Sequence, residues 1–138
     1  MLEYSVTARR IDSHGSEAFA KQARLVIDSD MSGRADAFNP AELLLASLAA
    51  CMLKSTERVV PMLDFDLRGM GVSLHGQRQD SPPKMVRIDY RITVDTDESD
   101  ARLDLLHRNL RKYGTITNTL AGATELVGTI RRKLPEEA

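Results

Sequence analysis

The stretch FNPAELLLASLAACMLKS, residues 38–55, is the most apolar segment of this 138-residue chain and decides its fold. Asn39 followed by Pro40 is a typical helix start, because asparagine caps free backbone N–H groups and proline fits the first helical position. The pattern predicts a helix from Pro40 to Val60, since Pro61 disfavours continuation. Such a helix has about 21 residues and is about 31 Å long.

The first half of this helix is apolar on nearly every side. Its apolar residues are Leu43, Leu44, Leu45, Ala46, Leu48, Ala49, Ala50, Met52 and Leu53. A helix that is apolar all round must be surrounded by other elements. One small sheet covers only one side, so we expect the same helix of a second subunit to cover the other. The sequence therefore predicts a homodimer.

Alternation of apolar and polar residues predicts strands on both sides of the helix. The expected strands are residues 2–8, 18–28, 66–75, 86–94 and 125–131. The third and fourth of these should form a hairpin around the turn QDSPPK. The order of elements predicts an α+β fold with a mostly antiparallel sheet, in a single domain over residues 1–138.

A second helix is expected between Ser99, which can cap its start, and Gly114, which is well placed to end it. Its apolar residues follow the helical spacing on one face, unlike those of the first helix. A short turn of helix is expected at residues 117–120. The tail LPEEA, residues 134–138, is expected to fray.

Composition excludes several classes of partner. Nineteen basic and twenty acidic residues are mixed along the chain, which predicts neither nucleic-acid nor membrane binding. No apolar run approaches the roughly 20 residues that span a bilayer.

The single cysteine excludes an internal disulfide, and the N-terminus lacks the pattern of a secretory signal, so we expect a cytoplasmic protein. His14, His75 and His107 form no metal-ligand spacing, and we predict no metal or other cofactor.

Cys51, the only cysteine, can be interpreted in two ways. A buried cysteine is usually a small apolar residue of the core. A reactive cysteine needs access for its substrate and a cation that stabilises the thiolate, and helical spacing brings Lys54 and Arg58 to its side. Glu42 lies nine residues earlier, about 13 Å along the helix axis and on the opposite face, so it could reach the thiol only through a partner helix.

Two motifs resemble a known family. NPAELLLASLAACM, residues 39–52, is similar to the Asn-Pro-x-Glu-Leu opening and helix cysteine of the OsmC/Ohr family, the osmotically inducible and organic hydroperoxide resistance proteins. RKYGTITNTL, residues 111–120, is similar to the segment of that family that holds its second cysteine. The resemblance implies an OsmC-like fold with a long central helix, and an intertwined homodimer. It also implies a peroxiredoxin-like oxidoreductase that reduces organic hydroperoxides in the oxidative stress response.

By this resemblance, Cys51 matches the cysteine that attacks the peroxide. Gly114 stands where the family carries its resolving cysteine, so no intramolecular disulfide can form. A single-cysteine cycle would stop at the sulfenic acid and need an external thiol as reductant. The alternative is a non-catalytic dimer that binds a small hydrophobic ligand in its interface pocket.

In the family, an arginine held by a glutamate activates the thiolate. Ala41 replaces one glutamate of the family's Asn-Pro-Glu-Glu variant here, and Glu42 remains as the candidate carboxylate. Arg9 and Arg10, at the end of the first expected strand, are the nearest candidates for the arginine, with Arg34 as a third. Spacing alone does not choose among the three.

Overall fold

The computed structural model describes residues 1–135 of the chain, and the prediction for the end of the LPEEA tail lies outside these residues. The chain divides into two compact units, residues 1–44 and residues 45 onward, which are described in turn. The single domain predicted for the whole chain stays a prediction. No helix of the described part is long and apolar enough to cross a membrane.

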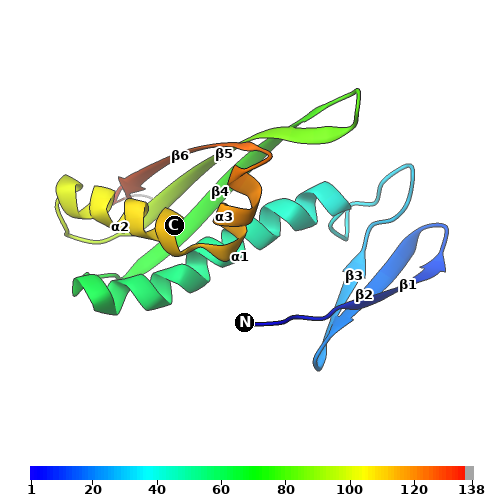
Figure 1. Ribbon diagram of the computed structural model, residues 1–138, viewed down its shortest axis with the longest axis horizontal. Helices are drawn as coiled ribbons and strands as arrows, with labels where there is room; N and C mark the ends of the chain where they lie inside the picture. The colour runs from blue at the N-terminus through cyan, green and yellow to red at the C-terminus, as the bar shows by residue number, and fades with distance from the viewer. Residues whose placement is uncertain (136–138) are drawn as a thin grey trace. The chain divides into compact units, whose positions relative to one another are not determined.

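The first unit is built on a three-stranded antiparallel sheet in the order β1-β2-β3 (Figure 1). Its strands are β1 (Thr7–Asp12), β2 (Gly15–Ala20) and β3 (Ala23–Ile27). The predicted first strand was placed too early, because residues 1–6 are not in a strand despite their alternating pattern. The predicted single strand over residues 18–28 was also wrong, since a turn divides it. Lys21 makes this turn with a positive φ of 55°, a conformation that is uncommon for a residue other than glycine and that its sequence did not reveal.

The long helix α1 (Pro40–Leu63) begins where the sequence predicts. Asn39 and Glu42 form a reciprocal capping box: the Glu42 N–H donates to Asn39 Oδ1 at 2.8 Å, and the Asn39 N–H donates to Glu42 Oε1 at 2.9 Å. The predicted end at Val60 is wrong by three residues, because Pro61 lies inside the helix. Proline removes one backbone N–H at this position. Because the position is close to the end of the helix, the loss of one hydrogen bond does not prevent a last turn.

The end of α1 is held by a residue far away in sequence. The guanidinium of Arg102 donates hydrogen bonds to the backbone oxygens of Leu63 and Asp64. It also lies over the ring of Phe65, 5.9 Å from the centroid. The last turn of α1 carries no basic residue of its own, so Arg102 supplies the positive charge that the C-terminal end of a helix favours.

The second unit contains a three-stranded sheet in the order β4-β5-β6. Strands β4 (Gly69–Gln79) and β5 (Lys84–Asp95) form the predicted antiparallel hairpin, and β6 (Glu125–Arg132) pairs with β5 in parallel. Helices α2 (Asp100–Tyr113) and α3 (Thr115–Ala121) connect β5 to β6, as a parallel connection requires. Ser99 caps α2 as predicted, with its hydroxyl accepting from the Arg102 N–H at 3.3 Å.

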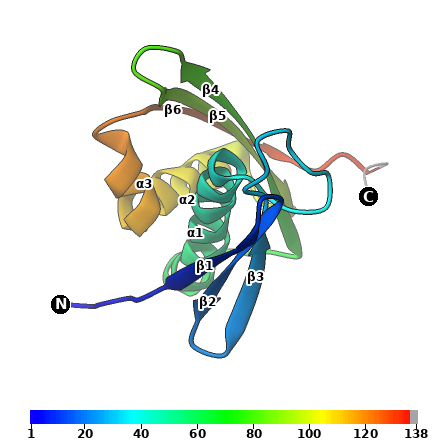
Figure 2. The same cartoon turned by 90° about the vertical axis from the view of Figure 1, so that its right-hand side faces the viewer.

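The core of the second unit lies between the sheet and its helices. Helices α1, α2 and α3 lie on the same side of this sheet (Figure 2). Apart from Phe65, the buried apolar residues of this core come from three elements: Leu48, Met52 and Val59 of α1, Ile88, Tyr90, Ile92 and Val94 of β5, and Leu103, Leu106 and Leu110 of α2. Every second residue of β5 thus points into the core, and the residues between them point away from the helices.

A polar cluster joins β5 to α2 inside this core. The Tyr90 hydroxyl lies 2.6 Å from Nε2 of His107 and accepts a hydrogen bond from Arg111 Nη1 at 3.1 Å. Arg111 also donates to the backbone oxygen of Leu126 on β6 at 3.3 Å. Burial raises the pKa of Tyr90 and lowers the pKa of His107, which favours the neutral form of both. The cluster is therefore a phenol and a neutral imidazole beside one guanidinium.

Candidate functional site

Cys51 lies in the fourth turn of α1, within the second unit, and is partly exposed. The backbone N–H of Ile116, in the first turn of α3, donates to its Sγ at 3.4 Å. Lys54 and Arg58, which the sequence placed near the thiol, are exposed residues of α1. Cys51 is therefore not a fully buried residue, and its sulfur lies against the start of α3.

Gly114 forms this junction, where the family resemblance expects a second cysteine. A Cβ atom at Gly114 would lie 2.7 Å from Oγ1 of Thr117 and 3.0 Å from the backbone oxygen of Leu110. A side chain therefore fits here only if Thr117 rotates and the neighbouring backbone shifts slightly. The Thr117 hydroxyl is buried and has no hydrogen-bond partner among the described residues. The α2–α3 junction is thus closely packed around Gly114.

Arg9 is held by a glutamate, although not by the one that the sequence suggested. It lies directly opposite Glu17 in the β1–β2 register, and its Nη2 donates to Glu17 Oε2 at 3.2 Å. Its guanidinium also lies 5.5 Å from the centre of the Phe19 ring. Glu17 is 8% exposed, and Arg24 approaches it from β3 at 3.7 Å. Sequence reasoning missed Glu17, because only the strand register brings it to Arg9.

Arg10 and Glu42 have different surroundings from the Arg9 pair. Arg10 is exposed, and no acceptor among residues 1–135 bonds to its side chain. Glu42 is engaged in the capping box with Asn39, so its carboxylate holds the start of α1. The structure therefore gives Glu42 a local structural role. Its predicted contribution to the thiol site stays a prediction.

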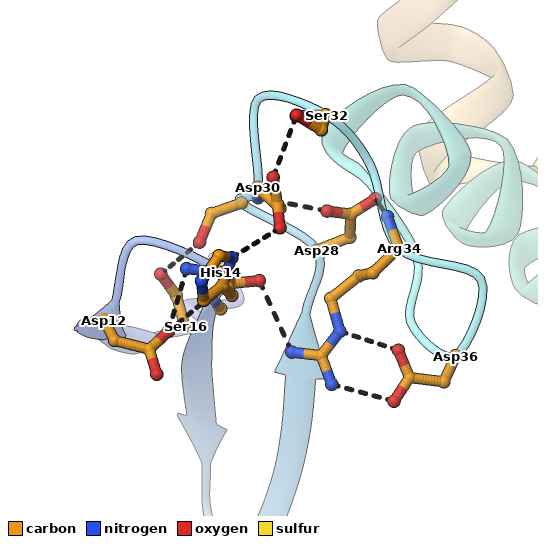
Figure 3. A network of polar contacts seen from close by, with 10 residues as sticks. Asp12, His14, Ser16, Asp28, Asp30, Ser32, Arg34 and Asp36 are labelled. Atoms are coloured by element: carbon orange, nitrogen blue, oxygen red, sulfur yellow. Dashed lines mark hydrogen bonds and ion pairs between the residues drawn. The ribbon is translucent and has the colours of Figure 1, made fainter.

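Arg34 belongs to a polar network in the loop between β3 and α1 (Figure 3). Its Nε and Nη2 donate to Asp36 at 2.6 and 2.8 Å, and its Nη1 donates to the backbone oxygen of His14 at 3.4 Å. His14 Nδ1 lies 2.7 Å from Oδ2 of Asp30, and this contact raises the pKa of His14. Asp28, which is buried, accepts from two backbone N–H groups of the same loop. The network fixes the loop and occupies the Arg34 guanidinium.

The two sheets, the long capped helix and the helix cysteine define an α+β protein of the OsmC-like fold. The family model for OsmC-like proteins matches residues 33–127, and the chain belongs to this family. Among curated proteins, none matches this sequence.

Solved structures of low sequence identity share the fold. The OsmC-like protein of Mycoplasma pneumoniae superposes with a TM-score of 0.89 at 19% identity, covering 96% of this chain and 99% of the other. An organic hydroperoxide resistance protein OsmC from Legionella pneumophila gives a TM-score of 0.76 at 16% identity, with 94% and 97% covered. The organic hydroperoxide resistance protein OhrB of Bacillus subtilis gives 0.71 at 14% identity, with 94% and 98% covered. The OsmC-like fold predicted from the sequence is therefore confirmed.

Proposed function

We propose that this protein reduces organic hydroperoxides with Cys51 as its single reactive thiol, and that an external thiol recycles it. Membership of the OsmC-like family supports a peroxiredoxin-like role, and two proteins of the same fold are named for organic hydroperoxide resistance. The observation that carries the proposal is Cys51 itself, a partly exposed residue whose Sγ accepts a hydrogen bond from the Ile116 N–H. The cycle suits the cytoplasm, where thiol reductants are abundant.

The proposed cycle has two stages. The Cys51 thiolate attacks the terminal oxygen of the hydroperoxide, the O–O bond breaks, and the alcohol leaves with a proton while the sulfur becomes a sulfenic acid. The chain has no second cysteine, so an external dithiol must attack this sulfur and release water. The second thiol of the reductant then closes its own disulfide and returns Cys51 to the thiol state.

Arg9 is the arginine that we assign to the thiolate. Its guanidinium is paired with a glutamate, Glu17, whereas Arg10 has no carboxylate partner among residues 1–135 and the three donor nitrogens of Arg34 are already bound to Asp36 and the His14 oxygen. A guanidinium oriented by a carboxylate can stabilise a thiolate and hold a peroxide oxygen. Glu17 then takes the orienting role for which the sequence suggested Glu42.

We infer that the working unit is a homodimer. All six residues of β1 are exposed, and a small sheet needs an apolar face packed against another element to be stable. Exposed large apolar residues include Leu2, Tyr4, Val6, Ile11, Leu25, Phe38 and Leu53. A second copy would bury such surfaces. Light scattering on the pure protein should give twice 15.3 kDa at micromolar concentration, and a monomer would contradict the inference.

Chemical trapping tests the proposed site. After one equivalent of tert-butyl hydroperoxide, dimedone should add once per chain, on the peptide that contains Cys51. Arg9→Met should slow this labelling about a hundredfold, because it removes the cation that we assign to the thiolate. Arg10→Met is the matched control and should leave the rate nearly unchanged. If Arg10→Met slows the reaction and Arg9→Met does not, the assignment of the arginine is wrong.

The trapping experiment also separates the enzyme from the alternative, a dimer that binds a small hydrophobic ligand without catalysis. That alternative predicts a Cys51 that forms no dimedone adduct after exposure to hydroperoxide. Nothing in the surroundings of Cys51 among the described residues favours it over the peroxidase. We therefore retain the thiol peroxidase as the single proposed function.

A further inference from the structure

The face of the second sheet that points away from the helices carries an unusual set of polar residues. Tyr90 and Ile92 point into the core, so Arg91 between them points outward. The strand register places Ser73 of β4 on one side of Arg91 and Thr129 of β6 on the other. All three side chains are exposed. Two hydroxyl groups therefore flank one guanidinium on neighbouring strands.

These side chains line a shallow cavity of about 510 Å³. His75 and Asp89, which face each other across β4 and β5, and Val127 complete its outward-facing lining. The volume lies within the roughly 300–1,000 Å³ of small-molecule sites. A ring nitrogen of His75 can donate a hydrogen bond in either tautomer, as can each hydroxyl. The cavity thus offers several donors around one positive charge.

Arg91 differs from Arg87 on the same face because it lacks an acceptor. Within the described part of the chain, no carboxylate or carbonyl oxygen bonds to its guanidinium. Arg87, four residues earlier, donates to Asp89 through Nε and Nη2 at 3.0 and 2.9 Å and lies 3.6 Å from Glu125. The Arg87 guanidinium lowers the pKa of Asp89, so this carboxylate stays ionised and paired. The Arg91 guanidinium thus carries a positive charge that no described acceptor pairs with.

We propose that Arg91, Ser73, Thr129 and His75 bind the terminal oxyanion of a small molecule, either a phosphate or a carboxylate. The planar guanidinium presents two parallel N–H donors that match both groups. The hydroxyls of Ser73 and Thr129 complete the set from the two neighbouring strands. This site lies on the face of the sheet opposite the one that packs against α1, the helix that carries Cys51, and is separate from the proposed peroxidase chemistry.

Titration followed by NMR tests the site with the intact protein. Inorganic phosphate and acetate are added separately to 15N-labelled protein at constant ionic strength, with sodium chloride as the reference, because unspecific charge effects are screened equally. We expect saturable shifts of the backbone amides at residues 73, 91 and 129. The anion with the lower dissociation constant identifies the preferred oxyanion.

Variants show whether Arg91 carries the binding. Arg91→Met should weaken it at least about tenfold, Arg91→Lys should have a smaller effect, and Thr129→Val should cost a few-fold. Arg108→Met is the matched control, since Arg108 is an exposed arginine of α2 without an acceptor among residues 1–135, and it should bind like the wild type. Shifts that do not saturate with either anion would overturn the proposal. Equal binding by the Arg91→Met and Arg108→Met variants would overturn it as well.

Discussion

Gly128→Ala is expected to destabilise the protein by about 3 kcal/mol or more, the largest effect on stability that the structure predicts. Gly128 lies opposite Tyr90 in the β5–β6 register. A Cβ atom at this position would lie 1.8 Å from Cζ of the Tyr90 ring. The ring is 3% exposed and its hydroxyl binds His107 and Arg111, so it cannot move without breaking the cluster that joins β5 to α2.

Thermal unfolding at fixed protein concentration measures this effect, and the melting temperature should fall by about 10 °C or more. Gly71→Ala is the matched control in the same sheet, because a Cβ atom there has no atom within 4 Å, and it should be neutral. Tyr90→Ala combined with Gly128→Ala should cost less than the sum of the two changes, since the smaller residue removes the clash. A Gly128→Ala variant as stable as the wild type would show that the ring does not pack on β6 in this way.

The parts of the fold that were predicted correctly depend on local sequence signals. Asn39 and Pro40 fix the start of α1, and Ser99 fixes the start of α2, because caps act within a few residues. The β4–β5 hairpin follows from alternation on both sides of a turn. In each case, the information lies in a short segment of the chain.

The parts that were missed depend on residues that are distant in sequence or on turns without glycine or proline. Lys21 makes a turn at a position where the sequence has no typical turn residue. The Glu17–Arg9 pair depends on the register of a hairpin whose strands were misplaced. The contact of Gly128 with Tyr90 requires the parallel pairing of β6 with β5, after two intervening helices. None of these follows from periodicity.

In the candidate site, too, the features with a local sequence signal were predicted and those that depend on long-range packing were not. Cys51 and the replacement at Gly114 could be read directly from the two motifs. The hydrogen bond from Ile116 to the sulfur could not, because it depends on how α3 packs beside α1. Glu42 was the candidate carboxylate because the motif contains it, and the pairing of Glu17 with Arg9 could not be predicted because it depends on strand register.

Cys51→Ser is expected to abolish hydroperoxide reduction, the largest effect on activity. A serine hydroxyl is not ionised at neutral pH and does not attack a peroxide oxygen, and the chain has no other cysteine to replace it. We expect a loss on the order of a thousandfold or more. Cys51→Ala serves as a second variant, because it removes the nucleophile without adding a polar group to this partly buried position.

Consumption of tert-butyl hydroperoxide in the presence of excess dithiol tests the central claim most directly. The wild type should turn over many equivalents per chain, and both Cys51 variants should match the rate without protein while melting close to the wild type. Turnover that persists in Cys51→Ser would remove the thiol from the mechanism, and a wild type without turnover would contradict the proposed peroxidase.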